Sequence, residues 1–291
     1  MKRQWIIDLV GQEAFEKLAG GLEPSQLQSV LLEVLQARAH ARSPADVLAQ
    51  WQRDAFVQPA AVDLRESVEI DRDLLAAAAA FEAVELSPVA PLGVCSSIAP
   101  TDQNRVLSAA RSTEVSSDPT NVLALLCASR LPGVSHLATS HRVVRAQPVP
   151  KGEPGYAPHF RLFALASGGI ETKDHGFTVE ALTLHIRTMV AALDRLEQRG
   201  YAFGDRKLEV LATPERASVA DRVAAAVGGA RGPLEHPYYA GLRYQLSVGG
   251  VPLVDGGSFD WLQKLKANRR AVYVASGLGA QLVALRFKRG A

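Results

Sequence analysis

The spacing of apolar residues divides the chain into a helical first part and a longer part that mixes helices with strands. Before residue 61, apolar positions recur three and four residues apart, which is the period of an amphipathic helix. Pro24 and Pro44 each open one of these runs, and proline is favoured in the first turn of a helix. We therefore predict a small all-helical segment over residues 1–60, with no chemical motif of its own.

Residues 61–291 contain both helical and strand patterns. The strands are joined by long loops and helices rather than by regular βαβ units, which indicates an α+β fold with a mainly antiparallel sheet flanked by helices. The predicted helices are 65–81, 121–130, 177–199, 215–227, 258–266 and a last helix from 278. The predicted strands are 84–89, 141–147, 160–166, 207–212, 239–248, 251–254 and 271–275.

Composition narrows the class of protein. Of the 291 residues, 47% are apolar and 21% are charged, which is typical of a folded chain and not of a disordered one. The 32 basic residues nearly balance the 30 acidic ones, so no strong field attracts nucleic acid or an anionic membrane. Asp8 interrupts the first apolar run, unlike a signal peptide, and no run approaches the ~20 apolar residues of a membrane helix. We therefore predict a cytoplasmic protein that does not bind membranes, and its overall charge does not favour nucleic acid as a partner.

Generic motifs identify no metal or nucleotide site. Cys95 and Cys127 are too few for a disulfide framework or a cysteine zinc site, and we expect both in the core. The seven histidines include no pair four residues apart with a glutamate between them, so no metal site is predicted. The chain also lacks a P-loop, a dinucleotide-binding glycine motif and a nucleophile elbow.

Two predicted strands carry arginines close to an aromatic ring. Arg145 and Gln147 share a face of the first strand, because side chains alternate along a strand. If the hairpin brings Arg161 and Phe163 to that face, two guanidinium groups flank a ring. Such an arrangement clamps a phosphate and stacks a base. A solvated hairpin with exposed arginines is the alternative.

Two further clusters are candidate binding residues. The Tyr238-Tyr239 pair precedes a predicted hairpin, and Gly256-Gly257 follows it. Glycines let a ligand approach the backbone closely, and tyrosine hydroxyls can donate to it. A glycine-rich turn beside core aromatic residues is the alternative. Asp118 precedes a predicted helix, where it either holds an ammonium group or caps the helix N-terminus.

The order of these clusters resembles the catalytic core of class II aminoacyl-tRNA synthetases, in the histidyl branch. Asp118-Pro119-Thr120 precedes the arginine-bearing hairpin, and a glycine-led helix at Gly277-Leu278-Gly279 follows the tyrosine and glycine clusters. The resemblance spans residues 62–291 and implies a six-stranded antiparallel sheet and a homodimer. Because it extends to the last helix of the sequence, we expect no anticodon-binding domain. The resemblance also implies ATP contacts by Arg145, Arg161 and Phe163, and amino-acid contacts by Asp118, Tyr238, Tyr239, Gly256 and Gly257.

The chain departs from the family pattern at positions that catalysis needs. Gln281-Leu282 stands where the resemblance implies an acidic residue and an arginine, and Gln147 replaces a glutamate. Leu234 replaces an arginine ahead of the tyrosine pair, and an apolar run from Ala164 replaces polar pocket residues. Losing one preorganised donor typically costs about 10²–10³-fold in rate. We therefore predict no catalytic residue.

Within this family, the resemblance implies a catalytically silent paralogue: the regulatory subunit of ATP phosphoribosyltransferase, the first enzyme of histidine biosynthesis. Such a subunit assembles with a short-form catalytic subunit and conveys histidine feedback. Arg145-Ala146-Gln147 is a sequence often found there. One alternative is a stand-alone amino-acid-activating ligase, with ATP as its candidate ligand. Another is a synthetase-like protein that binds RNA or a protein through its N-terminal helices. No cofactor is otherwise expected.

Overall fold

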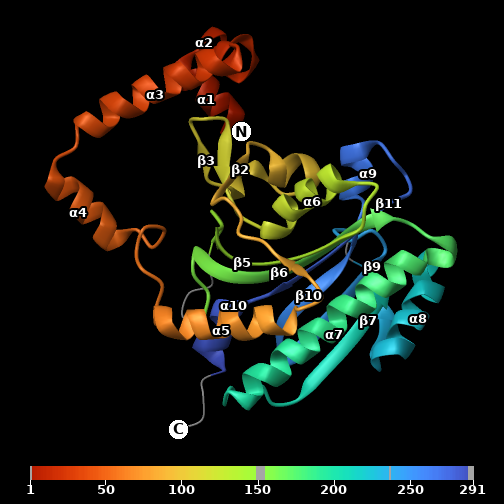
Figure 1. The fold of residues 1–291 in the computed structure, drawn as a ribbon. Helices are drawn as coiled ribbons and strands as arrows, with labels where there is room; N and C mark the ends of the chain where they lie inside the picture. Colours follow the sequence, from red (N-terminus) through yellow and green to blue (C-terminus); the bar gives the residue numbers. More distant parts are fainter. Residues whose placement is uncertain (1, 149–154, 236, 288–291) are drawn as a thin grey trace.

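The computed structural model describes residues 2–148, 155–235 and 237–287, and this part of the chain forms an eight-stranded sheet with helices on both faces (Figure 1). The strand order is β1-β5-β6-β11-β10-β9-β7-β8. The strands are β1 Glu82–Ala83, β5 Ser135–Val144, β6 His159–Ile170, β7 Arg206–Ala212, β8 Ala230–Pro233, β9 Leu242–Val248, β10 Val251–Phe259 and β11 Ala271–Leu278.

The predicted α+β fold with a mainly antiparallel sheet is confirmed, and the predicted six-stranded sheet is confirmed only in part, because the described sheet has eight strands. The six central strands pair antiparallel, whereas β1 and β8 each add a parallel pair at an edge. These edge strands are two and four residues long. Segments this short show no alternation of apolar and polar positions, so the sequence pattern does not reveal them.

A separate three-stranded sheet lies beside the main one. Its strands are β2 Val89–Pro91, β3 Ser108–Ala109 and β4 Thr113–Val115, in the order β2-β4-β3. The predicted strand over 84–89 is therefore wrong, because β1 ends at Ala83, before this range, and β2 begins only at its last residue, Val89. Pro88 lies between them, and proline has no N–H to donate to a ladder.

Each face of the main sheet has its own apolar core. One core lies between the sheet and α5 Leu64–Ala77, α7 Gly176–Gln198, α8 Ala217–Val227 and α10 Ala280–Arg286. The other lies between the sheet and α6 Pro119–Arg130 and α9 Trp261–Lys266. Cys95 and Cys127 belong to this second core, as predicted. No helix among the described residues has the length and apolar content to cross a membrane.

Several strands run further than the apolar pattern indicates. Strand β10 continues through Gly256 and Gly257 to Phe259, where the sequence indicated a turn and then a helix from 258. Strand β11 likewise continues to Leu278, so the last helix begins at Ala280. Strand β5 starts six residues earlier than predicted and ends at Val144. Arg145 and Gln147 therefore follow the strand instead of sharing one of its faces.

Four helices precede the body of the fold and extend away from it (Figure 1). They are α1 Lys2–Val10, α2 Gln12–Glu16, α3 Pro24–His40 and α4 Pro44–Arg53, with a π-helical turn Lys17–Gly21 after α2. Capping boxes at Glu23 and Ser43 begin α3 and α4, as the prolines predicted. No described side chain of these four helices is buried. The domain division at residues 60 and 61 stays a prediction.

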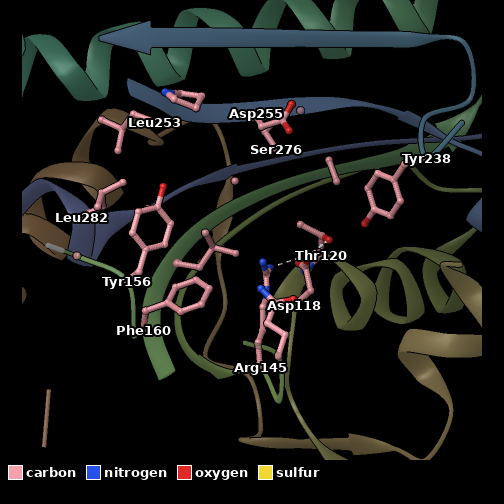
Figure 2. A pocket seen from close by; sticks show the side chains of 18 of the residues that line it. Asp118, Thr120, Arg145, Tyr156, Phe160, Tyr238, Leu253, Asp255, Ser276 and Leu282 are labelled. Atoms are coloured by element: carbon pink, nitrogen blue, oxygen red, sulfur yellow. Dashed lines mark hydrogen bonds and ion pairs between the residues drawn. The ribbon is translucent and has the colours of Figure 1, made fainter. Parts of the chain in front are cut away.

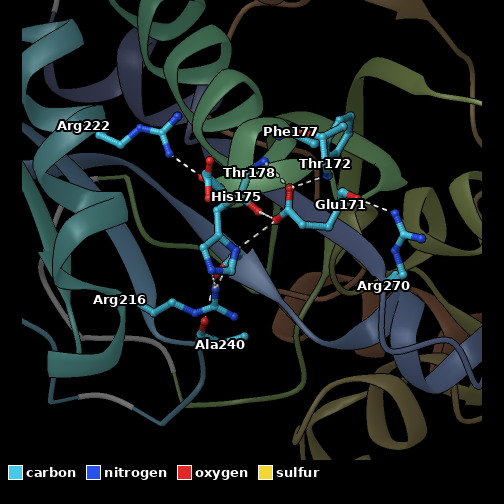
Figure 3. Close-up of polar contacts among 11 residues, drawn as sticks. Glu171, Thr172, His175, Phe177, Thr178, Arg216, Arg222, Ala240 and Arg270 are labelled. Carbon is cyan, nitrogen blue, oxygen red and sulfur yellow. Dashed lines mark hydrogen bonds and ion pairs between the residues drawn. The ribbon is translucent and has the colours of Figure 1, made fainter.

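The turn that leads from β6 into α7 is held by a cluster of charged side chains (Figure 3). Asp174 and His175 both have positive φ, of 54° and 57°, a left-handed conformation that is strained for residues other than glycine. His175 Nδ1 lies 3.5 Å from a Glu171 carboxylate oxygen, and Arg216 Nη1 lies 3.2 Å from the same nitrogen. Arg222 donates to the carbonyl oxygen of Asp174. These contacts fix the start of α7.

A hydrogen-bonded chain crosses the core under the sheet. His185 of α7 is fully buried, and its two ring nitrogens each lie 2.8 Å from a serine hydroxyl, those of Ser167 and Ser276. Ser167 in turn lies 2.7 Å from His136 Nδ1. A neutral imidazole has one donor and one acceptor, so it satisfies both serines. Burial lowers the pKa of His185 to about 3.

This histidine is expected to make the protein less stable in mild acid. The unfolded chain binds a proton at His185 below pH about 6.5, whereas the native state resists protonation until about pH 3. The contribution of His185 to the free energy of unfolding is therefore complete above pH about 6.5, and it decreases as the pH falls from there toward about 3. We expect a loss of about 2 kcal/mol between pH 7.5 and pH 5.

Urea unfolding at these two pH values measures the effect. The His185→Gln variant should lose most of the difference between pH 7.5 and pH 5, whatever its stability at either. The matched variant His40→Gln changes an exposed histidine of α3 and should keep the difference. An equal pH dependence in wild type and His185→Gln would contradict the expectation.

Candidate functional site

A cavity of about 530 Å³ opens beside the N-terminus of α6, a size that suits a small molecule. Its wall comes from α6, from the segment before β9, from the ends of β5 and β6, and from β10, β11 and α10. The two ends differ in character, as Figure 2 shows. Leu253, Leu282 and Tyr156 gather at one end, and Asp118 and Tyr238 lie toward the other.

Asp118 and Arg145 form the first charged pair of the cavity. Asp118 caps α6, because its Oδ1 accepts hydrogen bonds from the Thr120 N–H at 3.0 Å and the Thr120 hydroxyl at 2.7 Å. Its other oxygen lies 3.4 Å from Arg145 Nη2. Arg145 Nε also donates to the Ser117 carbonyl at 3.0 Å, and the guanidinium lies 5.1 Å from the centre of the Phe160 ring. Asp118 thus serves both as a helix cap and as a cavity residue.

Arg243 and Asp255 form the second pair. Arg243 donates twice to the carboxylate, at 2.9 and 3.0 Å, which is a bidentate pair of well-defined geometry. Its guanidinium also lies over the Tyr239 ring, 5.4 Å from the ring centre. The hydrogen bond to Asp255 raises the pKa of Arg243. The pairing of β9 with β10 shifts register between Pro252 and Val254. Arg243 therefore lies opposite Gly257, two residues along β10 from Asp255.

Aromatic side chains close the polar end. The Tyr238 ring packs edge-on against Tyr239 and Phe259, at 5.2 and 5.4 Å between centres. Burial, and then the nearby carboxylates of Asp118 and Asp255 respectively, raise the pKa values of Tyr238 and Tyr239. Both hydroxyls therefore stay protonated at neutral pH, and that of Tyr239 hydrogen-bonds to Asp255.

The charges of the cavity wall balance one another. Arg145 and Arg243 are the cationic side chains among the described lining residues, and each lies against a carboxylate. A bound phosphate would have to displace these carboxylates or lie beside them. The described wall therefore favours a neutral or zwitterionic ligand over a polyanion.

No family model matches the sequence, and no curated protein matches it. Solved structures do match. The structure is similar to an ATP phosphoribosyltransferase regulatory subunit/histidyl-tRNA synthetase from Bacillus halodurans C, with a TM-score of 0.58 and 16% identity over 78% of this chain and 80% of that one. The fold is that of a class II synthetase core of the histidyl branch.

Two other structures share this synthetase-like core. A histidine–tRNA ligase subunit from Alicyclobacillus acidocaldarius matches with a TM-score of 0.55 and 13% identity, over 79% of this chain and 95% of that one. The apo histidyl-tRNA synthetase of S. aureus matches with a TM-score of 0.53 and 11% identity, over 76% of this chain and 64% of that one. At such identities the likeness shows the fold alone. Each match leaves about a fifth or more of this chain uncovered.

Two of the residues predicted to contact ATP lie outside the cavity of the synthetase-like core. Arg161 donates to Asp71 of α5 at 2.6 Å, and Phe163 is fully buried in the core beneath α5. Their neighbours Phe160 and Leu162 line the cavity instead. The considered placement of Arg161 on the same face as Arg145 is therefore wrong. Side chains alternate between the two faces of a strand, and in β6 Phe160 and Leu162 face the cavity while Arg161 and Phe163 face α5 and its core.

The remaining predicted residues lie at or near the cavity. Asp118, Arg145, Tyr238, Tyr239 and Gly256 line it. Gly257 does not line it. A side chain at Gly257 would overlap the Leu242 carbonyl and lie 2.6 Å from a Tyr239 ring carbon, so this glycine permits close packing of β9 and β10.

Two of the departures from the family pattern, Gln281 and Leu282, lie on α10 and point to different sides of it. Leu282 lines the cavity, where the resemblance implied an arginine. Gln281 is buried and turned away, accepting a hydrogen bond from Arg142 at 3.2 Å. Arg231, three residues before the position of the missing arginine, donates to Asp221 at 2.8 Å and does not line the cavity.

Sequence reasoning missed several cavity residues. Phe160, Arg243 and Asp255 are the main ones, together with Tyr156 and Leu253 at the apolar end. The hairpin around Gly249-Gly250 was a usable signal for the ion pair, since it places Arg243 near Asp255 on the neighbouring strand. No comparable signal marked Tyr156, which lies shortly before β6.

Proposed function

We propose that this protein is a catalytically silent member of the histidyl-tRNA synthetase-like fold that acts as a regulatory subunit. The enzyme it regulates is ATP phosphoribosyltransferase of histidine biosynthesis. One observation carries this proposal: Leu282 lines the cavity where an activating enzyme of this kind needs a fixed positive charge. Phosphoryl chemistry depends on such charges around the reacting group, and an aliphatic side chain supplies none.

The ion pairs that Arg145 and Arg243 form with Asp118 and Asp255 support the same conclusion. Each guanidinium is already neutralised by a carboxylate, and both carboxylates face the cavity. A triphosphate in this cavity would meet two negative groups at close range. A free amino acid, which carries one charge of each sign, meets no such opposition. A cavity that binds an amino acid without activating it is what a feedback sensor requires.

The similarity to a regulatory subunit/histidyl-tRNA synthetase from Bacillus halodurans C agrees with this proposal. At 16% identity it supports the fold, and the role and partner are our inference. The ligase alternative retains one favourable feature, since Arg145 lies over the Phe160 ring as a nucleotide-binding pair would. The first experiment below separates the two.

Amino-acid-dependent ATP–pyrophosphate exchange tests for catalysis. We expect no exchange with any of the twenty amino acids, and no rise in melting temperature with saturating ATP. A ligand that binds only the native state must stabilise it, by about 2.7 kcal/mol at 100 times its Kd. The Leu282→Arg variant restores a cation to the wall and is expected to gain some stabilisation by ATP. Exchange that depends on one amino acid would instead make the protein a ligase.

Assembly with a catalytic subunit tests the regulatory role. We expect the purified protein to form a stable complex with the short-form ATP phosphoribosyltransferase subunit of the same genome, seen by light scattering after gel filtration. Histidine should then inhibit the complex and not the isolated catalytic subunit. Failure of the two proteins to associate would contradict the proposal, even if the exchange assay finds no ligase activity.

A further inference from the structure

The apolar end of the cavity is built from three separate elements. Leu253 comes from β10, Leu282 from α10 and Tyr156 from the segment just before β6, and Figure 2 shows these three side chains gathered together. Phe160 and Leu162 of β6 add to the same wall. This half of the cavity therefore offers a ligand apolar carbon from several elements at once.

The body of the fold holds these side chains in place. Leu253 is 4% exposed and belongs to the core beneath α10, while Leu282 is partly buried and packs against that core. The Leu253 carbonyl accepts a hydrogen bond from the Gly279 N–H at 3.3 Å, which ties β10 to the start of α10. The guanidinium of Arg286 lies 5.4 Å from the centre of the Tyr156 ring, an attractive contact. The apolar end is thus already formed before a ligand binds.

No charge of the described wall is left over for the apolar end. Its four charged side chains all belong to the two ion pairs, Asp118–Arg145 and Arg243–Asp255. The cavity of about 530 Å³ lies in the range that holds drug-sized molecules. A small polar amino acid beside the ion pairs would leave the apolar end in contact with water, whereas an apolar group would release that water.

Asp118 is placed to hold the other end of such a ligand. Its Oδ1 is occupied by Thr120, but its Oδ2 lies 3.4 Å from Arg145 Nη2, longer than the roughly 2.7–2.9 Å of a strong charge-assisted hydrogen bond. This oxygen can accept a shorter hydrogen bond from an ammonium group. An amino group at Asp118 is what the synthetase resemblance already implies, so the new element is the apolar group attached to it.

We propose that the cavity binds a primary amine that carries a long apolar group. The ammonium lies at Asp118, and the aliphatic or aromatic tail lies between Leu253, Leu282 and Tyr156. Leu282 then determines specificity, because it presents hydrocarbon to the tail where a synthetase presents a cation to phosphate. The inference goes beyond the proposed function, since a histidine effector needs only the polar end. It also does not depend on a catalytic subunit.

A homologous series of n-alkylamines tests the tail. Butylamine, hexylamine and octylamine are titrated into the full chain by isothermal calorimetry at neutral pH, where the amines are protonated. We expect the Kd to fall about fourfold for each added methylene group that reaches the apolar end. Hexanol and octanol carry the same tails without the charge. They should bind about tenfold more weakly than the matching amines, because they cannot pair with a carboxylate.

Variants locate the tail in this cavity. Tyr156→Ser removes an exposed ring, and Leu282→Asn replaces an aliphatic side chain by a polar one of similar size. Each should reduce the gain per methylene group to about twofold or less. Leu64→Asn is the matched control, since it changes a 69% exposed leucine of α5 that does not line the cavity, and it should keep the wild-type gain.

One further variant locates the ammonium. Asp118→Asn keeps a side chain that caps helices well, so α6 should still form. It is expected to remove the preference for amines over alcohols and to keep the dependence on chain length.

Three results overturn the proposal. The first is a Kd that does not change with chain length, or no binding even of octylamine. The second is a wild-type gain per methylene group in both Tyr156→Ser and Leu282→Asn, which would place the tail elsewhere. The third is equal affinity of the wild type for amines and alcohols. None of these results concerns assembly with a catalytic subunit, so this proposal and the proposed function fail separately.

Discussion

Replacing Asp73 by alanine is expected to lower the free energy of unfolding by about 3–5 kcal/mol. The Asp73 side chain of α5 is 4% exposed, and it accepts two hydrogen bonds from the guanidinium of Arg199 at the end of α7. Arg195 of α7 approaches the same carboxylate at 4.0 Å. Removing the carboxylate breaks an ion pair whose acidic side chain is buried, and losing one member of such a pair costs more than the pair itself contributes.

Chemical denaturation of the two proteins measures this difference. The matched control is Asp221→Ala, which removes the partner of Arg231 in an ion pair whose acidic side chain is 68% exposed. Pairs of this exposed kind contribute about 0–1 kcal/mol. Equal losses in the two variants would show that burial does not set the strength of the Asp73 contact.

The Gly257→Ala variant is expected to lose at least 2–3 kcal/mol of stability and to disturb the cavity. The added methyl group would overlap the carbonyl oxygen of Leu242 and lie 2.6 Å from a ring carbon of Tyr239. The first neighbour is backbone of the adjacent strand, so it cannot rotate away. Relief requires β9 and β10 to separate, which would move Arg243 and the tyrosine wall.

Gly277→Ala is the matched control for this prediction. Gly277 also lines the cavity, in the adjacent strand β11, but the nearest atoms to a methyl group there belong to the Leu162 side chain, at 3.6 Å or more. That is ordinary van der Waals contact, so we expect a change within about 0.5 kcal/mol. Thermal unfolding of both variants decides the matter: similar melting temperatures would mean that β9 and β10 are not held as closely as the structure indicates.

The parts of the fold that the sequence predicts well are those with strong local signals. Pro24, Pro44 and Pro119 mark helix starts, and the structure confirms all three. The order of clusters along the chain also predicted a synthetase-like fold, which the solved structures support. Asp118, Arg145 and the tyrosine pair do meet in one cavity, although their predicted ligand contacts stay predictions.

The failures occur where a local pattern does not fix the geometry. Strand β6 is apolar on both faces from Phe163 to Ala166, because it lies between two cores. Such a strand shows no alternation, so its register is set by pairing with β5 and not by its own sequence. That is why Phe160 was missed and Phe163 was chosen. Gly256 and Gly257 were likewise proposed as ligand contacts, with a turn as the alternative, because only the packing of neighbouring strands reveals that they lie within β10.

The paired arginines of the cavity also have a kinetic consequence. A surface with unbalanced charge attracts oppositely charged molecules over several ångströms and accelerates their encounter. Arg145 and Arg243 each lie beside a carboxylate, so the fields of the two members of each pair largely cancel at a distance. Long-range electrostatic attraction from these pairs therefore does not accelerate the association of a ligand with the cavity. The association rate should accordingly depend little on salt concentration.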